Sequence, residues 1–493
     1  MSLAIERPKF ALFHLNDAAA WSEVGEYLRK HFVYPRDFFN KINYFDGFVK
    51  SVLVERDYIC KDYRDSYHNF YSKKFTRYGD KCVRLHFFNT FIDKDKIWSL
   101  DDSYQANYVG YLVLRPTIPF CIGRVLLNAS FVNTGNAAMV SCKTEVNVLG
   151  SRFFIQAFPF MGQDTDVTVC AHAAIWMILR CFSTRYTYYR EVYPFQIAKM
   201  TSDVSWGRIL PSNGLTIAQI SEIFSNYGMY PDIYMRQNTQ DFERLLYYYI
   251  ESGIPLVAQV GPNHAVSIFG HVGELDYSAV KEYDHNGFIY YNSADLIKGV
   301  IANDDNHLPY YSLLRNKVAG KNISSFTVAD IVAIVIPLYE KIFLAADAIE
   351  PLFKNILSHD QFGFNKCAKR HNGEKLIVRP YLTTSRSYKK FRRSMPVYAG
   401  IEKLYLEMSM PKFIWVVELS TLDKYKNKKI IGEILFDSSA NKRDMLPFLS
   451  IHYPGFLLIN DRSQRGSKIS TFSVDDTKIT DYDMYISNLG GTT

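Results

Sequence analysis

The order of helix-like and strand-like segments between residues 170 and 305 constrains the fold more than any other feature of the sequence. Three segments with apolar residues at helical spacing come first, at 170–182, 214–228 and 239–253. Strand-like segments rich in β-branched and aromatic residues follow, at 254–261, 264–274, 286–294 and 298–305. Helices followed by consecutive strands are typical of an α+β domain with an antiparallel sheet, and not of alternating βαβ units.

Both ends of the chain mix helical and strand periodicities in the same way. Helix-like segments lie at 18–32, 344–357 and 398–409. At roughly 100–200 residues per domain, the 493-residue chain has room for several domains. We therefore predict a multidomain α+β protein with an N-terminal α+β domain at 1–150, a central domain at 151–340 and a C-terminal α+β domain at 341–493.

The composition is that of a globular protein and shows only a mild charge bias. Hydrophobic residues make up 48% of the chain and charged residues 22%, which is enough apolar material for several cores. The formal net charge of +7 permits an acidic partner without requiring one. No apolar run of about 18 residues occurs, so we expect no membrane span. The N-terminal residues also lack the pattern of a signal peptide.

The cysteines indicate the compartment. There are seven, an odd number, they are widely spaced, and no Cys-x-x-Cys pair occurs. A disulfide framework and a zinc finger are therefore not expected. We predict a reduced, cytoplasmic protein that requires neither a metal ion nor an organic cofactor.

Cys170 is the first residue with chemical potential, in the stretch VTVCAHAAIWMILRC. Ala174, Met177, Ile178 and Cys181 follow it at spacings of three and four and form the apolar stripe of a helix. Cys170 heads that stripe, in the first turn. Unpaired backbone N–H groups and the positive end of the helix dipole favour a thiolate at such a position. Cys170 is therefore a candidate nucleophile, although a free cysteine is also a common core residue.

A candidate base and candidate orienting groups follow Cys170 along the chain. His264 opens an apolar strand after a Gly-Pro-Asn turn, where a side chain can face a cleft. Asp304 follows the strand-like segment VIAN, and an acid there can hold an imidazole through its second nitrogen. Asp305 is the alternate acid, and Asn292 at the end of FIYYN is a third candidate because an amide also orients histidine.

The order of these residues resembles the papain-like cysteine peptidase superfamily. A cysteine heads a helix, NHAV opens a strand, and an acid follows a later strand. NHAVSIFGH is very similar to the strand that presents the histidine in papain relatives. QDTDVTVCAHAA followed by HAVSIFG and VIANDD also resembles the compact bacterial branch, such as the peptidase domains that trim bacteriocin leaders. The resemblance covers about residues 150–312 only.

The resemblance implies a papain-like fold for the central domain and a role for each residue. Cys170 is the nucleophile, His264 the base and acid, and Asp304 the orienting acid of a peptidase acting on a protein or peptide substrate. The family places a glutamine six residues before the cysteine to stabilise the oxyanion. Gln163 takes that role here but lies seven residues before Cys170, and Asp164 occupies the six-residue position.

Other functions share the same order of residues. Papain-fold transglutaminases, amidases and acyltransferases differ only in the acceptor of the acyl group, which three residues do not define. A non-catalytic papain-like scaffold that binds protein or nucleic acid is the alternative from another class. The segment SRSYKKFRRS at 385–394 interleaves basic residues with Tyr388 and Phe391, a pattern compatible with an acidic partner or a nucleic acid.

Overall fold

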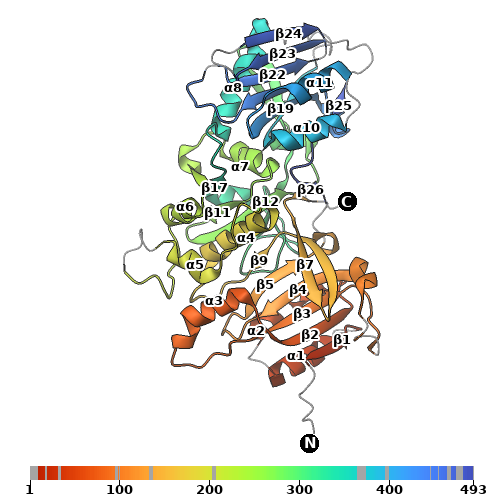
Figure 1. Ribbon diagram of the computed structural model, residues 1–493, viewed down its shortest axis with the longest axis vertical. Helices are drawn as coiled ribbons and strands as arrows, with labels where there is room; N and C mark the ends of the chain where they lie inside the picture. Colours follow the sequence, from red (N-terminus) through yellow and green to blue (C-terminus); the bar gives the residue numbers. More distant parts are fainter. Residues whose placement is uncertain are drawn as a thin grey trace, which may run out of the picture.

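The computed structural model describes residues 9–16, 19–31, 35–94, 98, 100–132, 137–201, 207–362, 374–394, 399–444, 446–453, 455–463, 468–473 and 481–491. They form an α+β protein with three large, mostly antiparallel sheets. The sheets follow one another along the long axis of the molecule, which is therefore elongated (Figure 1). The predicted α+β class is confirmed at this level.

The N-terminal sheet is six-stranded and antiparallel throughout. Its strands, in spatial order, are β1 (Phe10–His14), β2 (Ser51–Tyr58), β3 (Cys82–Phe88), β4 (Tyr108–Leu114), β5 (Ile122–Leu127) and β9 (Phe160–Met161). Helix α1 (Ala20–His31) lies within the helix-like segment 18–32 and buries Trp21, Val24 and Leu28 in the core. Strands β7 (Cys142–Val148) and β8 (Ser151–Ala157) form a hairpin. It packs in a second apolar cluster of this sheet, separate from the cluster that contains α1.

The central sheet contains the strands expected next to the candidate residues. Its strands run in the order β10 (Tyr230–Met235), β17 (Ile331–Leu338), β11 (Leu256–Val260), β12 (His264–His271), β15 (Gly299–Asn303) and β16 (Tyr311–Leu314). The short strands β6 (Ala138–Met139) and β26 (Gly490–Gly491) pair beside it. The segment 254–261 thus forms β11, and 298–305 forms β15, as predicted.

Helices cover both faces of the central sheet. The three predicted helices are α4 (Cys170–Arg185), α6 (Ile217–Asn226) and α7 (Phe242–Glu251). Successive residues of β11 alternate between the two faces: Val257 packs in the core that contains α4 and α6, whereas Leu256 and Ala258 pack in the core that contains α7. Because of this alternation, one face of the sheet is free to pack against α4, which contacts β12, the strand that begins at His264.

The third sheet contains a hairpin from the middle of the chain. Its order is β13 (Glu282–His285), β14 (Phe288–Asn292), β18 (Leu376–Thr384), β19 (Phe413–Thr421), β21 (Gly432–Asp437), β22 (Phe448–Tyr453), β23 (Phe456–Asp461) and β24 (Lys468–Ser473). The placement of the segment 286–294 in the central sheet is therefore wrong. Tyr290 of β14 is fully buried, and its hydroxyl donates to Glu350 of α8 (Ala346–Ser358), which fixes the hairpin in the third sheet.

Sheet membership crosses the positions at which we placed the domain boundaries. β9 at residues 160–161 belongs to the N-terminal sheet, although it follows residue 150. The hairpin β13–β14 joins strand β18 in a parallel pair across residue 340. Near the end of the chain, β26 returns to pair with β6 at the middle of the molecule (Figure 1). The three sheets are thus connected by exchanged strands.

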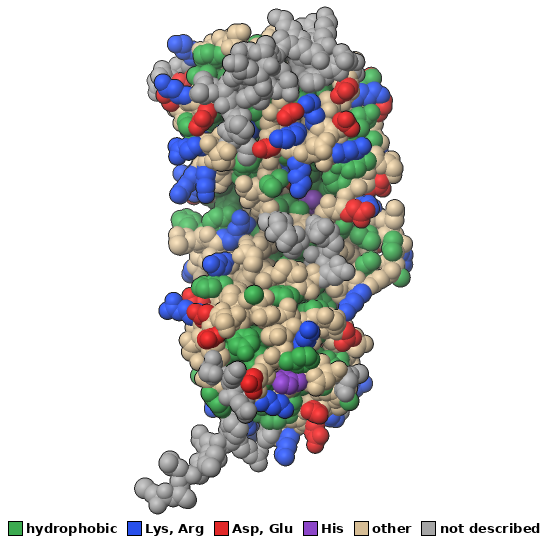
Figure 2. Space-filling model, turned by 90° about the vertical axis from the view of Figure 1, so that its right-hand side faces the viewer, with side chains coloured by type: hydrophobic (Ala, Val, Ile, Leu, Met, Phe, Trp, Pro, Cys, Tyr) green, Lys and Arg blue, Asp and Glu red, His purple; other side chains and the backbone are tan. Residues whose placement is uncertain are grey.

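The distribution of surface charge and the length of the apolar helices are two further properties of the molecule. On the face drawn in Figure 2, basic and acidic side chains are interspersed, with no region of a single sign. None of the helices within the described ranges is both long enough and apolar enough to cross a bilayer.

Candidate active site

Cys170 is the first residue of α4 and lies at the edge of a cavity. The preceding residue, Val169, is extended and its side chain makes no capping hydrogen bond, so the first-turn N–H groups receive no side-chain partner from it. Cys170 is half-buried, whereas the other five cysteines in the described ranges are buried. The helix thus exposes one thiol at its N-terminus and buries the apolar stripe that follows.

The cavity beside Cys170 has a volume of about 580 Å³. It lies between the start of α4, the loop before α6 and the turn that joins β11 to β12. The described residues of its walls include no Asp, Glu, Lys or Arg; they are Cys170, Ala171, Asn213, Gly214, Leu215, Thr216, Ile217, Gln219, Ile220, Gln259, Pro262, Asn263, His264 and Ala265. This volume is within the range of about 300–1,000 Å³ that is usual for ligand sites.

The register of the central sheet brings His264 and Asp304 together. β12 and β15 are antiparallel, with Ser267 opposite Asn303. His264 is the first residue of β12 and Asp304 follows the last residue of β15, so both lie at the same end of the pair. Nε2 of His264 lies 3.0 Å from Oδ1 of Asp304, an ion pair in which the N–H direction misses the oxygen.

His264 also contacts the thiol and an aromatic ring. Its side chain is close enough to the thiol of Cys170, at the start of α4, for that contact to raise the pKa of the imidazole. The ring of Phe326 is stacked on the imidazole at a centroid distance of 6.1 Å. The imidazole therefore lies between the thiol and the carboxylate, the geometry of a nucleophile, a base and an orienting acid.

The electrostatics of the pair favour a charged imidazole. Burial by itself lowers the pKa of His264, but the contacts with Asp304 and Cys170 outweigh it and raise the pKa to about 10. Burial alone raises the pKa of the Asp304 carboxyl, and the contact with His264 reverses this, so the pKa is lowered. At neutral pH the two groups are an imidazolium and a carboxylate. An imidazolium at a helix N-terminus is the environment in which cysteines become nucleophilic.

The alternate acid Asp305 is close to this pair but is not its ion-pair partner. Its carboxylate is buried, and neither oxygen has a hydrogen-bond partner within the described part of the chain. Burial and the neighbouring charge of Asp304 raise the pKa of Asp305 to about 7. Nitrogen and oxygen atoms of His264, Asp304 and Asp305 lie within 4.8 Å of one another, a set of ligands that could hold a metal ion.

The alternate Asn292 is wrong as a partner of His264. It ends β14 in the third sheet, where its Nδ2 donates to the hydroxyl of Tyr248 at 2.5 Å. Its Oδ1 accepts the backbone N–H of Ala294 at 3.0 Å and caps a short helix. Both ends of the amide are thus used within a fully buried network, because the hairpin β13–β14 belongs to another sheet.

The loop of residues 304–310, between β15 and β16, contains Asp304, and we call it the acid loop. Gln163 lies beside this loop and not in the wall of the cavity. Its Nε2 donates to Oδ1 of Asn306 at 2.9 Å, so the amide bridges the loop before α4 and the loop that contains Asp304. The role of Gln163 as an oxyanion donor stays a prediction, since this donor is occupied in the described conformation.

Asp164, at the six-residue position, organises the loop that leads to Cys170. Its Oδ1 accepts the backbone N–H groups of three residues, at 2.8–3.1 Å: Asp166, Val167 and Thr168. Nη1 of Arg115 lies 3.5 Å from its other oxygen, and Nη2 of Arg115 donates to the carbonyl oxygen of Gln163 at 2.7 Å. Arg115 comes from the N-terminal sheet, and no local pattern in the sequence links it to Cys170.

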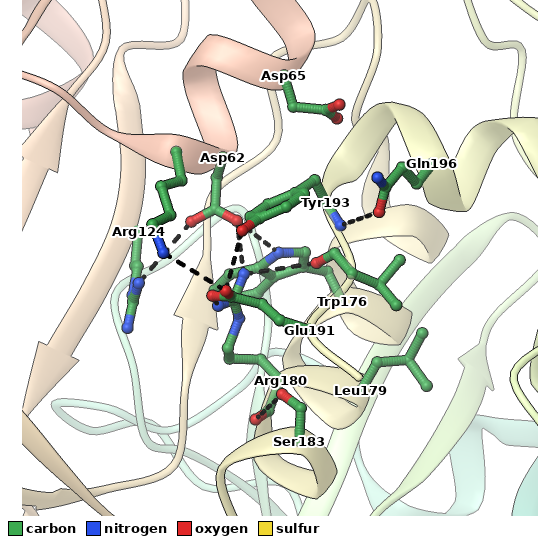
Figure 3. A network of polar contacts seen from close by, with 12 residues as sticks. Asp62, Asp65, Arg124, Trp176, Leu179, Arg180, Ser183, Glu191, Tyr193 and Gln196 are labelled. Atoms are coloured by element: carbon green, nitrogen blue, oxygen red, sulfur yellow. Dashed lines mark hydrogen bonds and ion pairs between the residues drawn. The ribbon is translucent and has the colours of Figure 1, made fainter. Parts of the chain in front are cut away.

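A buried network fixes the nucleophile helix to the N-terminal part of the chain. Oδ1 of Asp62, on α3 (Lys61–Asn69), accepts hydrogen bonds from Nε1 of Trp176 at 3.0 Å and from Nη2 of Arg180 at 2.8 Å (Figure 3). Arg180 also pairs with Glu191, and Arg124 approaches Asp62 from β5. These contacts hold two successive turns of α4 and so fix the direction in which Cys170 points.

The N-terminal sheet also holds the acid loop. The hydroxyl of Tyr310 donates to the carbonyl oxygen of Leu127 at 2.7 Å and lies 3.3 Å from the N–H of Phe158. The hydroxyl of Tyr44 donates to the carbonyl oxygen of Pro309 at 2.8 Å. The loop that follows Asp304 is thus attached to the N-terminal sheet by buried hydrogen bonds, which sequence analysis did not indicate.

The aromatic residues of the basic segment 385–394 are not available to a partner, and the binding of an acidic partner or a nucleic acid there stays a prediction. Most of it forms α10 (Ser385–Arg393), in which Tyr388 and Phe391 are buried. Arg392 is buried as well and pairs with Glu433. The helical period turns these side chains into the core because they belong to its apolar face. The basic side chains left exposed are those of Arg386, Lys390 and Arg393.

Comparison with known proteins gives no relative. No family model, no curated protein and no solved structure matches the chain.

Proposed function

We propose that the protein is a papain-like cysteine peptidase in which Cys170 is the nucleophile, His264 the acid and base, and Asp304 the orienting acid. The observation that supports this most directly is the placement of the His264 imidazole between the Cys170 thiol and the Asp304 carboxylate. Three segments that are far apart in sequence meet there, at the wall of a cavity large enough for a peptide segment.

The proposed reaction is acyl transfer to water in two stages. The thiolate of Cys170 attacks the carbonyl carbon of an amide, and a carbon–sulfur bond forms as the carbonyl oxygen becomes an oxyanion. The imidazolium of His264 gives its proton to the leaving amine as the carbon–nitrogen bond breaks. A water molecule then attacks the thioester and His264 accepts its proton; the carbon–sulfur bond breaks, which releases a carboxylic acid and restores the thiolate of Cys170 and the imidazolium of His264.

Asp304 and the start of α4 stabilise the charges in this sequence. The Asp304 carboxylate holds the imidazole ring in one orientation and offsets its positive charge. The backbone N–H of Cys170 is in the first turn of α4, where N–H groups have no intrahelical acceptor, and it is a donor for the oxyanion. Gln163 can act as a second donor only after its amide leaves Asn306.

The walls of the cavity indicate the substrate class. Among the described residues of the wall, His264 and Cys170 are the ionisable ones, so these residues offer no counter-charge to a strongly charged substrate segment. The amides of Asn213, Gln219 and Gln259 can hydrogen-bond a peptide backbone. We therefore propose an uncharged polypeptide segment as the substrate around the cleaved bond.

Thiol reactivity tests the proposal without knowledge of the substrate. The folded protein is treated with an iodoacetamide probe between pH 4 and pH 9, and labelling of each cysteine is followed by mass spectrometry. We expect Cys170 to label faster than the buried cysteines and to do so well below pH 8.5, the usual pKa of a thiol. His264→Ala should remove the labelling at low pH.

The result that contradicts the proposal is equal labelling of Cys170 in wild type and His264→Ala across the pH range. His285→Ala is the matched control, since His285 lies in the third sheet and should leave the profile unchanged. If the thiol is reactive, product analysis separates the two acceptors: a new carboxylate shows hydrolysis, and an isopeptide shows transfer to an amine.

A further inference from the structure

Asp305 is a buried carboxylate that the proposed mechanism does not use. It is 5% exposed, and both of its oxygens are without a hydrogen-bond partner in the described ranges. More than nine in ten buried polar groups in proteins are paired, so an acid with two unpaired oxygens requires an explanation. Protonation, bound water or a bound cation are the available explanations.

Two neighbours of Asp305, His264 and Asp304, carry groups that could bind a metal ion together with it. Ligand atoms of His264, Asp304 and Asp305 lie within 4.8 Å of one another. An imidazole nitrogen and two carboxylate oxygens are a donor set that Zn²⁺ binds at about 2.0–2.2 Å, which separates ligand atoms by about 3.3 Å in a tetrahedral site. Nε2 of His264 and Oδ1 of Asp304 are already 3.0 Å apart. Ligand atoms at most 4.8 Å apart need to approach by at most about 1.5 Å to reach the spacing of a tetrahedral site.

The charges of the cluster also favour a divalent cation. Asp304 and Asp305 are adjacent buried acids whose carboxylates repel each other. A divalent cation between them would balance both charges. Lys41, in the N-terminal part of the chain, is paired with Asp37 at 2.7 Å. His307, on the acid loop, lies 4.0 Å from Asp304.

We propose that His264, Asp304 and Asp305 form a regulatory site for a divalent transition-metal ion, with Zn²⁺ as the ion of choice, whose occupancy stops the reaction at Cys170. The inhibitory half of this proposal rests on the proposed function. A metal ion on Nε2 takes the place of the proton there and separates the ring from Asp304. The ring then no longer alternates between imidazole and imidazolium, the change on which proton transfer to the leaving amine depends.

Calorimetric titration of ZnCl₂ into the metal-free, full-length protein at pH 7.5 tests the site. We expect one saturable site in wild type and in Cys170→Ala. Asp305→Asn should weaken binding at least tenfold, because the amide keeps the shape of the acid and loses its charge. Asp46→Asn is the matched control: this acid is exposed and should leave the affinity unchanged. Thermal unfolding verifies each fold, and Asp305→Ser replaces Asp305→Asn if the latter does not fold.

Zinc affinity in Asp305→Asn and Asp305→Ser equal to wild type overturns the metal site. Inhibition is read separately, as the rate of Cys170 alkylation with and without ZnCl₂: it should slow in wild type and stay unchanged in Asp305→Asn. A Cys170 thiol that is inert in every protein, together with zinc binding that depends on Asp305, disproves the peptidase and supports the metal site. Alkylation that depends on His264 without any zinc binding supports the peptidase and disproves the metal site.

Discussion

Nε2 of His264 and Oδ1 of Asp304 lie 3.0 Å apart because two antiparallel strands end at the same edge of the central sheet. His264 begins β12, Asp304 follows β15, and Ser267 opposite Asn303 fixes their register. A slip of one residue in this register would move the side chains of one strand to the opposite face of the sheet and separate the pair. The imidazole is therefore positioned by the sheet, which is a more rigid support than a loop.

The first prediction separates the charge of Asp304 from its role as a hydrogen-bond acceptor. Asp304→Asn keeps an acceptor for the ring and removes the negative charge, whereas Asp304→Ala removes both. We expect the alkylation rate of Cys170 at pH 6 to fall about tenfold in Asp304→Asn and about 100-fold in Asp304→Ala; the larger loss is at the lower end of the range usual for acid–base groups. Equal rates in all three proteins would show that Asp304 does not orient His264.

The second prediction concerns the pH dependence of the pair. The pKa of His264 is raised from 6.5 to about 10 in the folded protein, so the imidazole binds a proton more tightly in the folded state than in the unfolded state. The stability that the pair contributes is then complete below about pH 6.5 and is lost as pH rises toward 10. The pKa of Asp304 is lowered, so the contribution also disappears as pH falls through the pKa of that carboxyl in the folded protein.

Imidazole resonances in NMR spectra measure this directly. We expect His264 to titrate near pH 10 in wild type and several pH units lower in Asp304→Asn. Burial in the third sheet lowers the pKa of His452 to about 4, so it should titrate there in both proteins and serves as an internal control. A His264 resonance that titrates identically with and without Asp304 would disprove the ion pair in solution.

Local periodicity was sufficient to predict much of the site. The apolar stripe after Cys170 predicted α4, and the apolar run after His264 predicted β12, because burial of one face imposes a period that is visible in the sequence. Period alone does not define the partner of a strand. β14 has a strand pattern that suits either sheet, and the hydrogen bond from Tyr290 to Glu350, sixty residues further on, places it in the third.

The support that the N-terminal sheet gives to the site could not be predicted for the same reason. No local sequence pattern distinguishes Asp62, Arg115 or Tyr44 from the residues around them. Their hydrogen-bond partners lie far away in sequence. The burial of Tyr388 was likewise hidden, since a basic segment with aromatic residues has the same composition whether its rings face a partner or the core.

The third prediction tests the loop before Cys170. Asp164 is buried, accepts three backbone N–H groups and faces Arg115. Asp164→Ala leaves these donors and the Arg115 charge unpaired, so we expect the free energy of unfolding to fall by about 3–5 kcal/mol. Asp166→Ala is the matched control, because Asp166 pairs with Lys74 at a half-exposed position and should cost about 0–1 kcal/mol. Urea denaturation measures both, and equal losses would contradict the assignment.

The fourth prediction tests whether the N-terminal sheet supports the acid loop. Tyr310 is buried, and its hydroxyl bonds the backbone at Leu127 and Phe158, whereas the hydroxyl of Tyr311 has no hydrogen-bond partner in the described ranges. Tyr310→Phe leaves two buried backbone groups unpaired, and we expect it to lower the free energy of unfolding by about 1–3 kcal/mol. Tyr311→Phe should change it by less than about 0.5 kcal/mol.

Alkylation of Cys170 then distinguishes support of the site from general stability. If the N-terminal sheet holds Asp304 in place through Tyr310, the low-pH labelling of Cys170 should be weaker in Tyr310→Phe than in Tyr311→Phe under conditions where both proteins are fully folded. A loss of stability in Tyr310→Phe with an unchanged labelling profile would show that the tyrosine stabilises the junction between the sheets without positioning the acid. The position of Asp304 would then depend on the pairing of β12 with β15 alone.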